Sequence, residues 1–110
     1  MSTPKPGRPV RGSRSGRPIM VLLDALGRRW ALRILWELRA GEQTFRALRD
    51  ACDDVSPSVL NQRLAELRDL GLLEAGATGY RLTEHGAALG KLLVPLDAWA
   101  QRWARHLGGS

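Results

Sequence analysis

Apolar residues recur every three or four positions along most of the chain beyond residue 18. This spacing is typical of helices that bury one face. A first helix is expected from Ile19, and Gly27 should interrupt it before a second helix begins near Arg28 and ends at Gly41. The pattern therefore predicts a mostly helical protein.

The second predicted helix is apolar on two sides. One side carries Trp30, Ala31, Ile34, Leu35 and Leu38. Leu32 and Trp36, one turn apart, lie on the other side. A helix with two apolar faces needs two partners, so we expect another subunit to cover the second face.

Two further helices have clear start signals. Residues 45–51 follow Thr44, a possible N-cap. After the turn DDVS, Ser56 is a good N-cap, Pro57 suits the first helical position, and Gly71 ends the helix. The buried stripe of this last helix consists of Leu60, Leu64 and Leu67.

The opposite face of that last helix carries side chains that suit DNA bases. It presents Ser58, Asn61, Gln62 and Ala65, with Arg63 and Arg68 flanking them. Asn and Gln bind adenine edges through two hydrogen bonds, Ser reaches a base or a phosphate, and Ala leaves room for a thymine methyl. Taken alone, such a face is more often an ordinary solvated surface.

The segment after this helix predicts a β-hairpin. Residues 72–75 and 80–83 are strand-like and flank a turn that contains glycine. Helix, turn, helix, hairpin is the order of a winged helix-turn-helix. The hairpin tip, with Thr78, Gly79 and Arg81, is expected beside the duplex, on phosphate or in the minor groove.

The last segment predicts a long helix that begins after the N-cap Thr83. Its apolar stripe consists of Leu89, Leu92, Leu93, Leu96, Ala100, Trp103 and Leu107. Some 25 residues of helix span about 37 Å, more than a small domain needs to cover itself. We therefore expect Leu32, Trp36, Trp99 and Trp103 to meet across the two-fold axis of a homodimer.

Charge divides the chain into two parts. Its 110 residues hold 17 Lys and Arg and 11 Asp and Glu, a net charge of +6. Residues 1–18 contain five of these bases, no acid, and many Pro, Gly and Ser, which predicts a disordered basic arm before a single domain at residues 19–107. Such an arm either follows DNA phosphates and enters a minor groove or only keeps the protein soluble.

Other classes of function lack their signatures. No stretch is apolar enough to cross a bilayer and no targeting segment is evident, so a cytoplasmic protein is expected. The single cysteine, Cys52, falls on a predicted buried face and suggests a structural thiol. Phosphate loops, metal-binding histidine pairs and nucleophile motifs are absent, so we expect neither an enzyme nor a cofactor.

Several segments together resemble the HxlR-type transcriptional regulators. They are the Gly-base-Trp start at 27–30, the helix opening at 45–48, Ser56 with Leu60 and Leu64, and YRLTEHG after the hairpin. The resemblance spans roughly residues 23–99. It implies a homodimer in which the N- and C-terminal helices pair and the second helix of each motif lies in successive major grooves of double-stranded DNA. The dimer interface expected on these grounds consists of Leu22, Leu26, Leu32, Trp36, Leu96, Trp99 and Trp103. The DNA-binding residues expected on these grounds are Thr44, Arg46, Ser56, Pro57, Ser58, Asn61, Gln62, Arg63, Thr78 and Arg81.

Two alternatives remain open. A winged helix can bind protein instead of DNA, and residues 19–110 are nearly neutral, with 12 bases against 11 acids. A dimer cleft lined by tryptophan could also hold a flat hydrophobic effector, although buried aromatic side chains more often serve packing. Steep salt dependence would distinguish DNA binding from protein binding.

Overall fold

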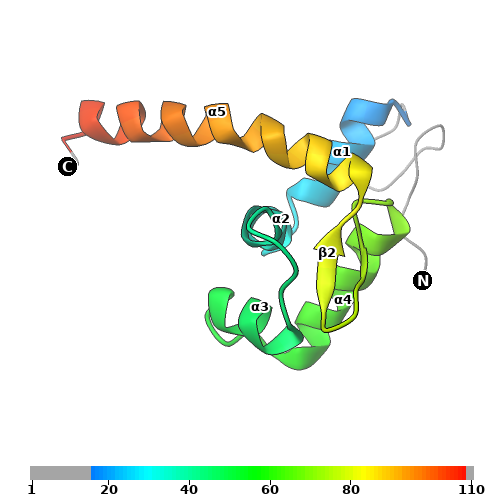
Figure 1. Ribbon diagram of the computed structural model, residues 1–110. Coiled ribbons are helices and arrows are strands. Elements are labelled where there is room, and N and C mark those ends of the chain that lie inside the picture. Colours follow the sequence, from blue (N-terminus) through cyan, green and yellow to red (C-terminus); the bar gives the residue numbers. More distant parts are fainter. Residues whose placement is uncertain (1–15, 109–110) are drawn as a thin grey trace.

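The computed structural model describes residues 16–108, so most of the predicted basic arm lies outside the described residues. The elements follow in the order α1 (Pro18–Leu26), α2 (Ala31–Leu38), α3 (Phe45–Ala51), α4 (Pro57–Asp69), β1 (Leu73–Ala75), β2 (Tyr80–Leu82) and α5 (Glu84–His106). This is the predicted winged helix-turn-helix, mainly α with a small β-hairpin. Figure 1 shows α5 along one side of the molecule, whereas α3, the start of α4 and the hairpin tip lie at the opposite end.

The core forms where α2, α3, α4 and the hairpin meet. Its most deeply buried side chains are Ile34, Leu35, Leu48, Leu60, Leu67, Leu73 and Cys52. They come from the stripes that the sequence predicts, because residues at helical spacing share one face. Burial raises the pKa of the Cys52 thiol, so this side chain stays protonated at neutral pH and behaves as a small apolar group.

The predicted starts of α3 and α4 are confirmed. The Thr44 hydroxyl accepts the backbone N–H of Ala47 at 3.0 Å, and the Ser56 hydroxyl accepts that of Val59 at 3.3 Å. Each bond satisfies a backbone donor that the first turn of a helix leaves free. Gly71, with φ of 74°, follows the end of α4 and adopts the left-handed conformation that favours glycine.

The start of α2 differs from the prediction. The helix begins at Ala31 and not near Arg28, because Trp30 has φ of 77° and cannot continue a right-handed helix. A left-handed conformation is costly for a bulky residue, and packing of the Trp30 side chain against the core offsets that cost. The resulting turn separates α1 from α2 and turns the Arg28 side chain and the Arg29 carbonyl toward α4.

The hairpin is short and joined to the α2–α3 loop. Its register pairs Leu73 with Leu82, Glu74 with Arg81 and Ala75 with Tyr80. The loop residue Gln43 adds a bridge to Tyr80, with N–H to carbonyl distances of 3.0 and 2.9 Å. The hairpin therefore holds the segment that leads into α3.

The long helix α5 starts against the end of α4. Its N-cap, Thr83, accepts the Gly86 N–H at 3.1 Å and donates its own hydroxyl to the Gly71 carbonyl. From there the helix runs through Pro95, and its C-terminal half extends beyond the rest of the domain (Figure 1). None of the helices between residues 16 and 108 combines the length and the hydropathy that a membrane crossing requires.

Candidate nucleic-acid interface

Helix α4 presents the predicted polar face to solvent. Its buried stripe, Leu60, Leu64 and Leu67, is at most 3% exposed. The side chains of the opposite face are all exposed: Ser58, Asn61, Gln62, Ala65 and Arg68. The first turn of α4 contains no acidic residue, and because Pro57 has no N–H and the Val59 N–H binds the Ser56 hydroxyl, the Ser58 N–H is the backbone donor that an anion would meet.

Arg63 does not belong to this exposed face. Its Nε donates to the Arg29 carbonyl at 3.0 Å, and its Nη1 pairs with Glu66 one turn further along α4. Only 16% of its side chain is exposed. These bonds give Arg63 a role inside the protein, and its contact with DNA stays a prediction.

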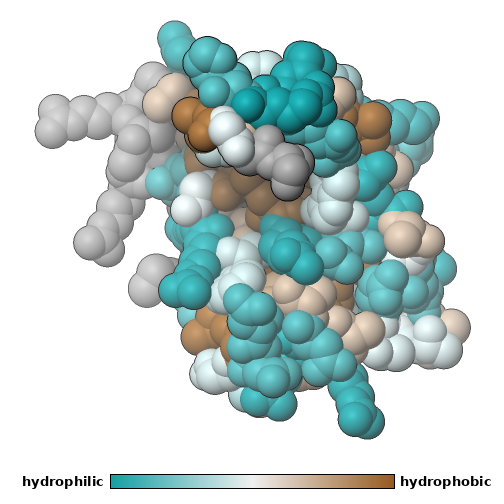
Figure 2. Space-filling model, turned by 90° about the vertical axis from the view of Figure 1, so that its left-hand side faces the viewer, coloured by the Kyte–Doolittle hydropathy of each residue, from teal (hydrophilic) through white to brown (hydrophobic). Residues whose placement is uncertain are grey.

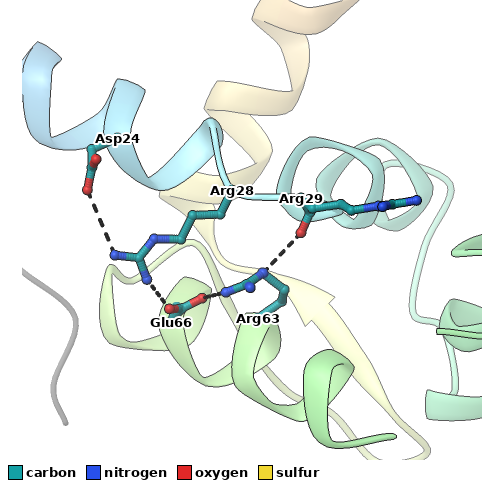
Figure 3. Close-up of polar contacts among 5 residues, drawn as sticks. All are labelled: Asp24, Arg28, Arg29, Arg63 and Glu66. Atoms are coloured by element: carbon teal, nitrogen blue, oxygen red, sulfur yellow. Dashed lines mark hydrogen bonds and ion pairs between the residues drawn. The ribbon is translucent and has the colours of Figure 1, made fainter. Parts of the chain in front are cut away.

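A network of charged side chains ties α4 to the α1–α2 turn (Figure 3). Glu66 receives Arg63 on one carboxylate oxygen and Arg28 on the other, and Arg28 also lies 3.8 Å from Asp24 in α1. The Glu66 side chain is only 14% exposed, and a carboxylate so far out of water needs its cations close by. The network fixes the rotation of α4 about its axis and thus keeps the polar face outward.

Replacing Glu66 with alanine should lower the free energy of unfolding by about 2 to 3 kcal/mol, because two partly buried guanidinium groups lose their counterion. The change can be measured by urea denaturation. Glu37→Ala is the matched control. Glu37 pairs with Arg33 in the same i, i+4 geometry that links Arg28 to Asp24, but that pair is 52% and 32% exposed, so its removal should cost less than about 1 kcal/mol. Equal costs for the two variants would contradict the anchoring role of Glu66.

The start of α3 contributes a second group of predicted contacts. Thr44 and Arg46 are both exposed, and the Thr44 hydroxyl serves as the helix cap. Ser56 and Pro57 at the start of α4 are exposed as well, and the Ser56 and Ser58 hydroxyls lie 3.4 Å apart. Both helix starts thus carry exposed hydroxyls, which are suited to phosphate oxygens.

The hairpin contacts that the sequence predicts have partners within the protein. Thr78 donates its backbone N–H and its hydroxyl to the Glu42 carboxylate, both at 2.6 Å. Arg81 donates its Nε to Glu74 at 2.8 Å. The pKa of Glu42 is lowered, mainly because its carboxylate accepts the hydrogen bonds from Thr78, so this group is ionised at neutral pH. Sequence reasoning missed Glu42, since a glutamate in an exposed loop carries no distinguishing pattern.

A capped helix with an outward polar face, followed by a short hairpin, defines a winged helix-turn-helix of the kind found in transcriptional regulators. The HxlR-like helix-turn-helix family model matches residues 25–107, and the chain belongs to this family. It is therefore a DNA-binding transcriptional regulator and not an enzyme.

Relatives of known sequence and structure agree with this assignment. The chain is 32% identical over 88 residues to the HTH-type transcriptional regulator YvaP of Bacillus subtilis, an alignment that covers 74% of this chain and 82% of YvaP. It is 27% identical over 88 residues to an HTH-type transcriptional regulator of Methanocaldococcus jannaschii, covering 76% and 83% of the two chains. The crystal structure of quinone-bound YodB from B. subtilis is similar, with a TM-score of 0.69, 30% identity, and coverage of 76% of this chain and 96% of YodB.

Proposed function

We propose that this regulator acts in the cytoplasm as a homodimer that binds specific sites in double-stranded DNA, with α4 of each subunit in the major groove. The observation that carries the proposal is the exposed polar face of α4 on a helix whose orientation is fixed. Its leucine stripe is buried, and Glu66 pairs with Arg28 and Arg63 from both carboxylate oxygens. Rigid placement matters because bidentate contacts to base edges tolerate little displacement.

The proposed contacts divide into two groups. Asn61 and Gln62, with Ser58 beside them, read base edges. Thr44, Arg46, Ser56 and Pro57, at the helix starts, position the protein on phosphates. Arg63, Thr78 and Arg81 are not among these proposed contacts. The Arg63 side chain binds a backbone carbonyl of the protein, and those of Thr78 and Arg81 bind carboxylates.

Selection of bound sites from random duplexes, followed by footprinting, tests the proposal. A two-fold symmetric site is expected. Asn61→Ala or Gln62→Ala should then relax base preference at one position of each half-site and cost about 1 to 3 kcal/mol on the selected sequence. Arg46→Ala is the contrasting variant: it should weaken binding to all sequences alike and reduce the slope of log K against log salt by about 0.9 for each phosphate that it leaves without a cation.

Uniform weakening by Asn61→Ala and Gln62→Ala would show that α4 does not read bases. A wild-type protein that selects no duplex, or whose binding is insensitive to salt, would favour a protein partner over DNA and overturn the proposal.

The exposed apolar side chains of α5 support the homodimer. On α5, Leu92 is 70% exposed, and Leu96, Trp99 and Trp103, further along the helix, are each about half exposed. The two tryptophan rings stack, with centroids 5.7 Å apart. Apolar groups of this size rarely stay in water on a helix that reaches beyond its own domain, so a second copy of the chain is the proposed cover.

A groove between α2 and α5 adjoins these residues. It is lined by Leu32, Arg33, Trp36, Leu93, Leu96, Asp97 and Ala100, and its volume is about 360 Å³. Figure 2 shows hydrophobic surface in a recess below α5. Leu32 and Trp36 therefore fit the predicted interface. Leu22 and Leu26 are half-buried and pack against the core of their own chain, so they contribute less to it.

The same groove is the proposed site for a small hydrophobic effector. Its apolar walls and its volume suit a flat molecule, and the similar structure of YodB contains a bound quinone. Titration with quinones and other flat aromatic compounds should quench the fluorescence of Trp36. A flat titration, with Trp36→Phe as the baseline, would count against this site.

A further inference from the structure

The tip of the hairpin is fastened to the loop between α2 and α3. Glu42 of that loop accepts both the N–H and the hydroxyl of Thr78 at 2.6 Å. The next residue, Gln43, exchanges two backbone hydrogen bonds with Tyr80. Two successive loop residues thus bind the hairpin turn and the first residue of β2.

Two glycines allow this close approach. A Cβ on Gly79 would lie 2.1 Å from the Gln43 carbonyl oxygen, and one on Gly76 would lie 1.9 Å from a carboxylate oxygen of Glu42. Neither distance is possible for a real side chain. Gly76 and Gly79 therefore let the hairpin tip pack directly against the loop. A tip that extended away from the protein toward a ligand would not require glycine at these two positions.

The charge of this region is unfavourable for phosphate. Arg81 is the only cation in residues 73–82, and its Nε binds Glu74 at 2.8 Å. Glu74 first and Glu42 second raise the pKa of the Arg81 guanidinium, so both carboxylates lie close enough to compensate its charge. Two carboxylates against one guanidinium leave the region with a charge of −1, which repels a DNA backbone.

We propose that the hairpin is a brace for α3 and not a DNA-contacting wing, and that Glu42 is the residue that positions α3 through it. This inference rests on the proposed DNA-binding function. Glu42 and Gln43 directly precede Thr44, whose hydroxyl caps α3. Fixing the loop therefore fixes the start of α3, where Arg46 lies. The DNA-reading surface of one subunit is then confined to the start of α3 and to α4.

Three variants separate a brace from a contacting wing. Glu42→Ala removes the fastening, Glu42→Gln keeps an acceptor for Thr78 but removes the charge, and Arg81→Ala removes the only cation of the hairpin. Both positions, Glu42 and Arg81, make exposed contacts at the surface, so the three variants should fold. Affinity for the selected site is measured over a range of salt concentrations, and amide hydrogen exchange is measured on the free protein.

For a brace, Glu42→Ala should bind the selected site roughly fivefold more weakly, the equivalent of one hydrogen bond in positioning energy. Its amides should exchange faster at residues 76–79 and at the start of α3. Glu42→Gln should restore most of the affinity and the slow exchange. Arg81→Ala should leave the affinity within about twofold and the salt slope unchanged.

A contacting wing gives the opposite results. Arg81→Ala would then reduce the salt slope by about 0.9, and both Glu42 variants would bind DNA as tightly as the wild type or more tightly, since each removes a negative charge near phosphate. Either result overturns the brace while leaving the proposed function intact. If the wild type binds no duplex, the proposed function fails. Independently of DNA, the brace is overturned if amide hydrogen exchange at the start of α3 is the same in Glu42→Ala as in the wild type.

Discussion

Replacing Gly86 with alanine is expected to lower the free energy of unfolding by about 3 kcal/mol or more and to abolish DNA binding at moderate temperature. A Cβ at this buried position would lie 1.8 Å from the Leu72 carbonyl oxygen and 2.8 Å from its carbon. Both are backbone atoms of the link between α4 and β1, so relief of the clash requires a shift of whole elements. Urea denaturation followed by tryptophan fluorescence measures the decrease in stability.

Gly90, one turn later in α5, provides the matched control. A Cβ there would lie 3.1 Å from the flexible Arg39 side chain, which can yield, and 3.6 Å from a methyl group of Leu82, which is an ordinary contact. Because alanine is the better helix former, Gly90→Ala should be neutral or stabilise by up to about 1 kcal/mol. Similar decreases at both positions would show that helix flexibility, and not close approach to Leu72, explains the first effect.

The close packing at Gly86 also connects the part of the domain proposed for dimerisation with the part proposed for DNA reading. Thr83 donates its N–H to the Leu72 carbonyl at 3.2 Å and its hydroxyl to the Gly71 carbonyl. These bonds and the close approach of Gly86 fix the start of α5 to the end of α4. The helix proposed for dimerisation and the helix proposed for DNA reading therefore meet at one rigid joint, so the orientation of α5 in a dimer sets the separation of the two α4 helices.

Local signals in the sequence predict most of this fold correctly. Thr44, Ser56 and Pro57 mark the starts of α3 and α4 because a cap residue acts on the backbone within three residues of itself. The leucine stripe of α4 and the two strands follow from helical and hairpin spacing in the same way. Such features need no knowledge of distant parts of the chain.

The features that sequence reasoning missed depend on distant partners. Arg63 lies beside the polar face by helical spacing, but its side chain turns inward to the carbonyl of Arg29, 34 residues earlier. Glu42 acquires its role from Thr78, 36 residues later. The left-handed conformation of Trp30 likewise depends on packing against the core. Tertiary contacts decide these three cases, and no local period encodes them.

Alanine at Trp99 or Trp103 is expected to weaken the proposed homodimer by a factor of about 30 or more, and the double variant should be monomeric at micromolar concentration. Stacked, half-exposed tryptophans on an otherwise uncovered helix are the side chains that contribute most energy to an interface. Analytical ultracentrifugation measures the change. Because neither ring belongs to the domain core, circular dichroism and thermal stability of the monomer should stay close to those of the wild type.

Gln101→Ala is the matched control, because Gln101 lies between the two tryptophans in sequence but on the opposite side of α5, where it binds Asp97 at 3.1 Å. Gln101→Ala should leave the dimer unchanged.

The monomeric double variant should also bind specific DNA far more weakly. One subunit contacts a single half-site, so it loses the affinity that simultaneous binding to two half-sites adds. A wild-type protein that sediments as a monomer would rule out this face of α5 as the interface, and so would tryptophan variants that remain dimeric. A monomeric variant that keeps full affinity for the selected site would show that DNA reading does not depend on dimerisation.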